Sequence, residues 1–246
     1  IDDSNNKKLI KKINFKNFFT FGVSVNANFQ ITNIIYKKNS SSFDILVKLP
    51  NKKIFSIKNI RIPLLGLHNI KNATAAIAVT LIIGISTKTI KTGLRQFKGV
   101  QRRFNKIFSY NKIDFYDDYA HHPTEIRSVL EGVKNVYGKC EKVCIFQPHR
   151  ISRLKDLKNE FSYAFKDADT VILCPIYAAG EKIKLGFSYE DFAKNIVKNS
   201  NVKLFMIENN QQLAKYCKQS MYGKKIVVGM GAGSISNWIK ELPNLI

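Results

Sequence analysis

Hydrophobic and polar positions follow two different patterns along the chain. In its first part, short β-rich or alternating runs are separated by polar segments, a pattern typical of strands joined by hairpin turns. We expect strands over residues 18–25, 28–37, 43–49 and 53–58, with turns at 37–42 and 50–53. Longer apolar runs after "GLHN" and after the break "GIS" then predict helices over 70–83 and 89–97.

From residue 113 onward, predicted strands and helices alternate. The strands are expected over 113–117, 142–146, 169–174, 202–207 and 224–230. The first of the intervening helices opens at Pro123, a favoured first helical position, and the others span 153–165, 189–198, 210–219 and 234–242. This alternation predicts an α/β fold with a doubly wound, mainly parallel sheet. We place a boundary near residue 98, which divides the chain into domains 1–97 and 98–246.

Composition narrows the class of protein. The 246 residues are 45% hydrophobic and 24% charged, which is ordinary for a globular protein. The longest apolar run, 75–85, is far shorter than the ~20 residues of a membrane span, and the first residues do not resemble a signal peptide. Four cysteines without a C-x-x-C pair predict reduced thiols, so we expect a cytoplasmic protein. Because the first residue is Ile, we also expect a fragment or a processed chain.

The formal charge of +22 first suggests a nucleic-acid partner. Lysines, however, are scattered through every segment, and no Arg-rich arm, RNP-type aromatic motif or zinc finger occurs. The charge therefore favours a polyanionic ligand in general and gives no reason to expect specific nucleic-acid binding.

Polar clusters follow four strands of the second part. "DDYAHH" brings Asp117, Asp118, Tyr119 and His121; "QPHRISR" brings His149, Arg150 and Arg153; "PIYAAGE" brings Glu181; and "GMGAG" brings a glycine turn. In open α/β sheets, ligands bind beyond the carboxyl ends of the strands. We therefore predict that these side chains meet at one rim and form a site.

Each cluster also has a purely structural interpretation. Asp118 or His122 could cap the helix that begins at Pro123, and His149 could be an ordinary loop histidine. Arg150 and Arg153 at a helix start oppose the helix dipole, which favours a bound anion there. The glycine turn lacks the full G-x-G-x-x-G pattern and is a weak phosphate signal. Adjacent histidines seldom bind one ion, so no metal site is predicted.

The first part contributes amide and cationic groups. His68, Asn69 and Asn72 lie at a helix start, where amides could bind a purine edge or cap the helix. Arg102 and Arg103 follow the predicted boundary, where a cation could reach a phosphate.

Taken together, the runs "GLHNIKNATAAIAV", "GVQRRF", "DDYAHHPTEI", "FQPHRISRLKDL", "YAAGE" and "GAGSI" resemble the Mur ligases. The resemblance covers residues 66 to 246 and implies an enzyme with a UDP-sugar domain, a central ATPase domain and a Rossmann-like domain. It identifies 1–97 as the end of the central domain and 98–246 as the Rossmann-like domain. No G-x-x-x-x-G-K-[ST] loop occurs, and the family's magnesium ligands are missing, so we expect the isolated chain to be inactive.

The resemblance also implies a chemistry and site roles. Family members activate a carboxylate with ATP and Mg²⁺ as an acyl phosphate, which an amine then attacks. The segment 147–153 favours the members that join L-alanine to UDP-N-acetylmuramate in cytoplasmic peptidoglycan precursor synthesis, and hence serve the cell wall, cell shape and cell division. His68, Asn69, Asn72, Asp118 and Arg103 would bind ATP. Five residues would face the acyl phosphate and alanine: Tyr119, His121, His149, Arg150 and Arg153. The catalytic residues would be His121, Arg103, Arg150 and Arg153.

Three alternatives stay open at this point. The chain could belong to the related ligases that attach a recycled tripeptide to the same sugar nucleotide. It could be a non-catalytic module that binds a nucleotide or another polyanion. It could also be a basic RNA-binding protein, whose binding would be strongly salt-dependent.

Overall fold

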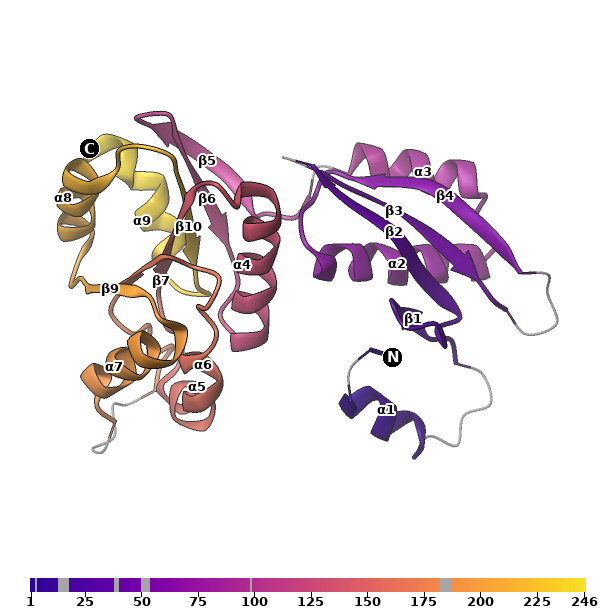
Figure 1. The fold of residues 1–246 in the computed structure, drawn as a ribbon, viewed down its shortest axis with the longest axis horizontal. Helices are drawn as coiled ribbons and strands as arrows, with labels where there is room; N and C mark the ends of the chain where they lie inside the picture. Colours follow the sequence, from indigo (N-terminus) through magenta and orange to yellow (C-terminus); the bar gives the residue numbers. More distant parts are fainter. Residues whose placement is uncertain (3, 13–17, 38–39, 50–53, 98, 182–186) are drawn as a thin grey trace. The chain divides into compact units, whose positions relative to one another are not determined.

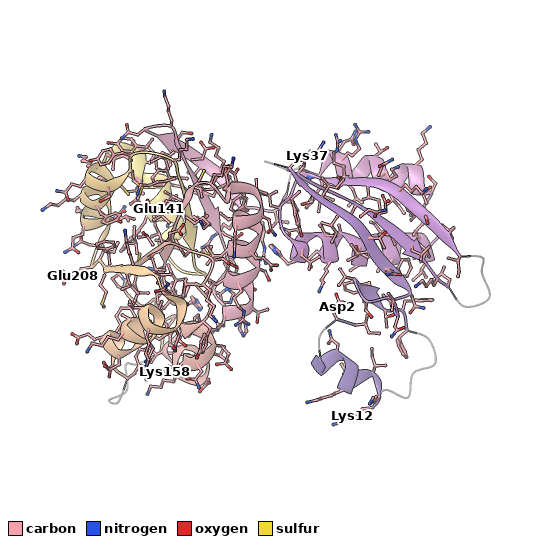
Figure 2. All side chains as sticks on the ribbon, in the orientation of Figure 1. Asp2, Lys12, Lys37, Glu141, Lys158 and Glu208 are labelled. Carbon is pink, nitrogen blue, oxygen red and sulfur yellow. The ribbon has the colours of Figure 1, made fainter. Side chains whose placement is uncertain are left out.

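The computed structural model describes residues 1–246 except for 3, 13–17, 38–39, 50–53, 98 and 182–186 (Figure 1). Contacts within the chain divide it into two compact units, Ile1–Gly99 and Val100–Ile246. The division lies two residues after the boundary placed from the sequence. Charged side chains such as those of Lys12, Lys37 and Lys158 project into solvent (Figure 2).

Unit 1 is a four-stranded sheet with helices. In sheet order, its strands are β1 Phe21–Gly22, β2 Phe29–Lys37, β3 Ser40–Val47 and β4 Phe55–Ile62; β1 runs parallel to β2, and the other pairs are antiparallel. Its helices are α1 Ser4–Ile10, α2 Leu67–Ile82 and α3 Thr87–Gln96. Alternate residues of β2 and β3, among them Phe29, Ile31, Phe43 and Ile45, are buried against Ile70 and Ile77 of α2.

Several predictions for unit 1 need correction. The strand expected over 18–25 is reduced to β1, and α1 was not predicted. The serines at 40–42, expected in a turn, belong to β3 because they pair with both neighbouring strands. The turn expected at 50–53 lies outside the described residues.

Unit 2 is a doubly wound α/β sheet, as predicted. Its strands, in chain order, are β5 Asn105–Tyr110, β6 Ile113–Asp118, β7 Glu141–Phe146, β8 Thr170–Leu173, β9 Lys203–Met206 and β10 Lys225–Met230. The order across the sheet is β5-β6-β10-β7-β8-β9, and every pair is parallel except β5 with β6. The helices are α4 Pro123–Tyr137, α5 Ile151–Asp156, α6 Lys158–Ser162, α7 Tyr189–Ser200, α8 Asn210–Ser220 and α9 Ile235–Glu241, and a 3-10 turn at Leu242–Asn244 follows.

The central strands of unit 2 are buried on both faces. Successive residues of β7 alternate between two hydrophobic cores: Cys144 and Phe146 pack on the side of α4, α6 and α7, and Val143 and Ile145 on the side of α8 and α9 (Figure 1). This burial explains why the strands are nearly continuous apolar runs. The free thiols of Cys144, Cys174 and Cys217 are buried, as expected for reduced structural cysteines.

Two features of unit 2 differ from the prediction. The helix expected over 153–165 is two short helices, because the backbone at Leu157 leaves the helical region (φ −114°, ψ 26°). Strand β5 was missed. It forms an antiparallel hairpin with β6, and the turn uses positive φ at Asn111 and Lys112, where neither residue is glycine.

Candidate functional site

The parallel register of unit 2 aligns the carboxyl ends of four strands. Asp118 is paired with Met230, Met230 with Phe146, and Phe146 with Leu173. The segments that follow these strands therefore start side by side along one edge of the sheet. The polar clusters noted in the sequence do lie on adjacent loops.

Two of those loops bring His121, His149 and Arg153 together. The His121 and His149 rings lie 5.8 Å apart between centroids, and Arg153 Nη1 is 3.3 Å from His149 Nδ1. Tyr119 meets the edge of the His121 ring at 5.2 Å, and Tyr177 stacks on His149 at 5.5 Å with an interplanar angle of 15°. The result is a row of two imidazoles and two phenols beside a guanidinium, which we call the imidazole row.

Hydrogen-bond partners indicate which ring nitrogen of each imidazole carries a proton. His121 Nδ1 lies 2.9 Å from the Tyr119 carbonyl oxygen and 3.3 Å from Glu125 Oε2. Both partners are acceptors, so Nδ1 carries the proton and Nε2 can accept one. His149 Nδ1 faces Arg153, which only donates, so in His149 the proton is on Nε2. Burial and the charges of Arg153, His121 and Arg150 lower the pKa of His149.

Glu125 orders the segment that carries both neighbouring histidines. Its Oε2 accepts hydrogen bonds from the backbone N–H groups of His121 and His122, at 3.0 and 3.2 Å. His122 is the N-cap of α4, and its Nδ1 accepts from Thr124 N, which completes a capping box. Capping by His122, the structural alternative considered above, is confirmed. Burial opposes ionisation of Glu125, but these hydrogen bonds and the positive field of His121 and Arg103 lower its pKa below the ordinary value.

The two arginines of "QPHRISR" differ in their surroundings. Arg150 has φ +68°, and its N–H donates to the Tyr177 carbonyl oxygen at 2.9 Å. Arg153 is the third residue of the six-residue α5, so it lies in both the first and the last turn of this short helix. An anion is present at the start of α5, but it belongs to the chain. The Glu181 carboxylate accepts from Ser152 N–H at 3.0 Å and from its hydroxyl at 2.6 Å.

Asp117 and Asp118 are both buried, at 1% exposure. Asp118 accepts hydrogen bonds from Phe104 N at 2.9 Å and Ala120 N at 2.8 Å. Burial raises its pKa to about 7, against the opposing effects of those N–H donors and of Arg103. Asp117 accepts from the Ser236 hydroxyl at 2.6 Å. Asp118 therefore ties the segment before β5 to the end of β6, and its expected contact with a ribose stays a prediction.

The glycine turn after β10 is packed closely against its neighbours. A Cβ at Gly233 would lie 2.6 Å from Tyr177 Cγ and 2.5 Å from Gln147 Oε1. Gln147 is 3% exposed, and its Oε1 accepts from Ile235 N at 3.0 Å. The small residues let this turn approach the loops of the imidazole row, so the turn serves packing and does not form an open phosphate cradle.

Arg102 and Arg103 also lie at this edge of the sheet. The Arg102 guanidinium lies 4.7 Å above the Tyr119 ring and donates a hydrogen bond to the Gly231 carbonyl oxygen. Because this bond fixes the guanidinium, its stacking on the ring orients Tyr119. The backbone N–H of Arg103 donates to Asn105 Oδ1 at 2.8 Å, and its side-chain charge acts on Asp118 and Glu125.

In unit 1, His68, Asn69 and Asn72 lie in the first turns of α2. The N-cap of α2 is Gly66, so none of the three caps the helix. Asn69 is buried, and its Nδ2 donates to the Leu65 carbonyl oxygen at 2.7 Å. Asn69 and Asn72 line an apolar pocket of about 520 Å³ between α2 and α3. A contact of these amides with adenine stays a prediction.

Residues that the sequence reasoning did not single out complete the site: Gln147, Ser152 and Tyr177. Glu125, which holds the backbone of His121 and His122, also belongs to the site. In the part of the chain that the structure describes, no three His, Cys, Asp or Glu side chains gather as metal ligands.

Comparison with known proteins identifies the class of protein. Residues 102–233 match the family model of the Mur ligase glutamate ligase domain, and residues 1–80 match the Mur ligase middle domain. The chain belongs to the Mur ligase family.

Two curated relatives and one solved structure carry the name UDP-N-acetylmuramate–L-alanine ligase. The chain is 63% identical over its full length to the UDP-N-acetylmuramate–L-alanine ligase of Pelagibacter ubique, covering 53% of that protein. It is 39% identical to that of Mesorhizobium japonicum over 96% of the chain and 50% of the relative. The crystal structure of UDP-N-acetylmuramate-alanine ligase MurC from Thermotoga maritima superposes with a TM-score of 0.72 at 25% identity, over 92% of this chain and 47% of that one. The chain thus spans about half the length of the curated relatives it matches.

Proposed function

We propose that this chain forms the amino-acid side, and part of the nucleotide side, of an ATP-dependent ligase that joins L-alanine to UDP-N-acetylmuramate. The observation that carries the proposal is the imidazole row, where His121, His149 and Arg153 meet beside a rim of strand ends. The 63% identity to a ligase of that name supports the choice of substrates.

The reaction must remove a poor leaving group. A carboxylate oxygen of the muramoyl group attacks the terminal phosphorus of ATP, ADP leaves, and an acyl phosphate forms. The alanine amine then adds to the carbonyl carbon and loses a proton. The tetrahedral intermediate collapses with loss of phosphate, and the product is an amide. When bound, ATP supplies the activating phosphoryl group, and magnesium would neutralise its charge.

We assign the residues of unit 2 to the second half of this sequence. The Arg153 guanidinium, assisted by Arg150, binds the alanine carboxylate, because a planar pair of N–H donors matches two carboxylate oxygens. His121 takes the amine proton on Nε2, since its Nδ1–H is held by Tyr119 and Glu125. His149 stays neutral because its lowered pKa disfavours the charged form, and Tyr119 forms one wall.

The nucleotide contacts are assigned by motif. His68, Asn69 and Asn72 would hold adenine, Asp118 the ribose, and Arg103 the terminal phosphates.

In the described residues, no helix is long and apolar enough to cross a membrane. We place the protein in the cytoplasm, in the synthesis of peptidoglycan precursors, with no specific nucleic-acid partner.

A chimera tests the proposal. This chain is fused to the part of the Pelagibacter ubique ligase that it does not cover, and the intact relative is the control. With ATP, UDP-N-acetylmuramate and L-alanine, we expect equal amounts of ADP, phosphate and UDP-N-acetylmuramoyl-L-alanine. Product formed only with a peptide would indicate the tripeptide-recycling alternative. Nucleotide binding without any product, in a folded chimera, would indicate a non-catalytic module.

A further inference from the structure

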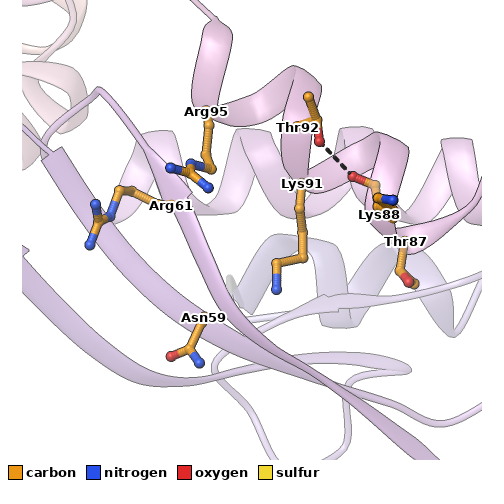
Figure 3. Close-up of a pocket in the computed structure, with 7 residues that line it drawn as sticks. All are labelled: Asn59, Arg61, Thr87, Lys88, Lys91, Thr92 and Arg95. Atoms are coloured by element: carbon orange, nitrogen blue, oxygen red, sulfur yellow. Dashed lines mark hydrogen bonds between the residues drawn. The ribbon is translucent and has the colours of Figure 1, made fainter.

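A basic hollow lies on unit 1, on residues that the proposed ligase chemistry does not use. It encloses about 590 Å³ and is lined by Asn59 and Arg61 of β4 and by Thr87, Lys88, Lys91, Thr92 and Arg95 of α3 (Figure 3). We call it the basic pocket. The positions 88, 91, 92 and 95 follow helical spacing, so one face of α3 forms one wall.

The basic pocket has four cations and no carboxylate in its lining. Lys91 extends from α3 toward β4, above Asn59, and its Nζ donates to the Lys58 carbonyl oxygen at 2.8 Å (Figure 3). Among the residues the structure describes, Arg61, Lys88, Lys91 and Arg95 form no ion pair. The Asp44 carboxylate accepts hydrogen bonds from the backbone N–H of Asn59 and from Asn33 Nδ2.

The two units differ in how many internal carboxylates their basic groups can pair with. In unit 2, some basic groups pair with carboxylates: Lys106 with Asp114, Lys134 with Asp167, Lys142 with Asp169, and Lys225 with Glu141. Residues 1–99 contain 17 Lys and Arg but only 3 Asp and Glu, so unit 1 has few internal anions to offer. Four cations share one hollow without an internal counter-ion.

This arrangement costs stability when no ligand is bound. Like charges three and four residues apart on a helix destabilise it by roughly 0.2–0.5 kcal/mol per pair, and Lys88 in the first turn also opposes the helix dipole. A multivalent anion would relieve all of these interactions at once. Asn59, Thr87 and Thr92 add neutral hydrogen-bonding groups around the same space.

The lining also restricts the class of anion. It contains no aromatic side chain on which a base could stack, and single-stranded nucleic acids depend on such stacking along an extended groove. The volume suits a compact group. The geometry points to a binding site for a small oligophosphate, such as a di- or triphosphate group, at the basic pocket.

Calorimetric titration of the 246-residue chain with sodium tripolyphosphate tests the site. We expect saturable one-to-one binding that weakens as salt rises from 50 to 200 mM, because ions screen exposed charges. The double variant Lys88→Gln/Arg95→Gln should weaken binding at least about tenfold, the equivalent of ~1.4 kcal/mol. Both residues are exposed on α3, so the fold should be retained, which far-UV circular dichroism checks.

Matched variants separate this site from general electrostatics and from the ligase site. Lys8→Gln/Lys12→Gln removes the same charge from exposed positions elsewhere in unit 1 and should leave affinity within about twofold, the ordinary effect of screened surface charge. Equal weakening by both double variants, or no saturable binding, would overturn the proposal. So would loss of binding in Arg103→Ala alone, which would place the anion in unit 2. Binding of an RNA oligomer at the basic pocket without binding of tripolyphosphate would also refute it.

Discussion

Removing the Glu125 carboxylate should destabilise unit 2 by an amount that the capping geometry predicts. In Glu125→Ala, the backbone N–H groups of His121 and His122 lose acceptors at 3.0 and 3.2 Å. A lost cap costs about 1 kcal/mol, and a hydrogen bond to a charged group somewhat more, so we expect a loss of about 2 kcal/mol. For a domain of this size, that corresponds to a fall in Tm of about 4–8 °C.

Urea unfolding followed by fluorescence measures this loss. Trp238 is the only tryptophan of the chain, and it packs against a core of unit 2, so its emission reports that unit. The control is Glu131→Ala, which removes an exposed carboxylate from the middle of the same helix and should change the free energy of unfolding by less than about 0.5 kcal/mol.

The destabilisation caused by Glu125→Ala should depend on pH. The pKa of Glu125 is lowered in the folded state, so its stabilisation is complete above the ordinary value of 4.5 and is lost as pH falls through the lowered value. The difference between the chain and Glu125→Ala should therefore shrink between pH 5 and pH 3. Equal effects of Glu125→Ala and Glu131→Ala at pH 7 would refute the capping role.

Three further predictions concern the site. In the chimera, Arg153→Ala should raise the KM for L-alanine at least about tenfold, because a charge-assisted pair of this kind exceeds ~1.4 kcal/mol, whereas Lys155→Ala on the same helix should not; equal KM values would contradict the carboxylate assignment. Arg153→Gln should raise the pKa of His149 in an NMR titration, since burial remains but one neighbouring cation is gone; an unchanged pKa would contradict that coupling. The pKa of Asp118 is about 7 in the folded state and 3.8 in the unfolded state, so its ionisation should lower the free energy of unfolding as pH rises. Relative to Asp118→Asn, the free energy of unfolding should fall by on the order of 2 kcal/mol between pH 5 and 7, and a flat difference would refute this shift.

Much of unit 2 could be predicted because its local signals agree with one another. Strand β7 is apolar and buried from Val143 to Phe146, as a strand covered on both faces must be, and Pro123 marks a helix start correctly. Strand β5 was missed because it lies at an edge of the sheet, where its half-exposed residues show no continuous apolar run.

The sequence predicted that polar side chains would gather at one edge of the sheet, but not which of them touch. Strand order placed His121 and His149 on one rim, and the structure brings their rings within 5.8 Å. That Tyr177 stacks on His149, and that Glu181 caps Ser152, depends on loop conformations with positive φ at Arg150 and Ala179. Neither residue is glycine, so the sequence carries no signal for those turns. The sequence suggested His122 as a cap of α4, and the structure adds the reciprocal hydrogen bond to Glu125.

The most direct test of the account is a crystal structure of the chimera with a phosphinate analogue of the tetrahedral intermediate. We expect the analogue's alanine carboxylate on the guanidinium of Arg153 and its nitrogen position within hydrogen-bonding distance of His121 Nε2. An analogue bound in an ordered complex that touches none of His121, His149 and Arg153 would contradict the assignment of the imidazole row as the reaction centre.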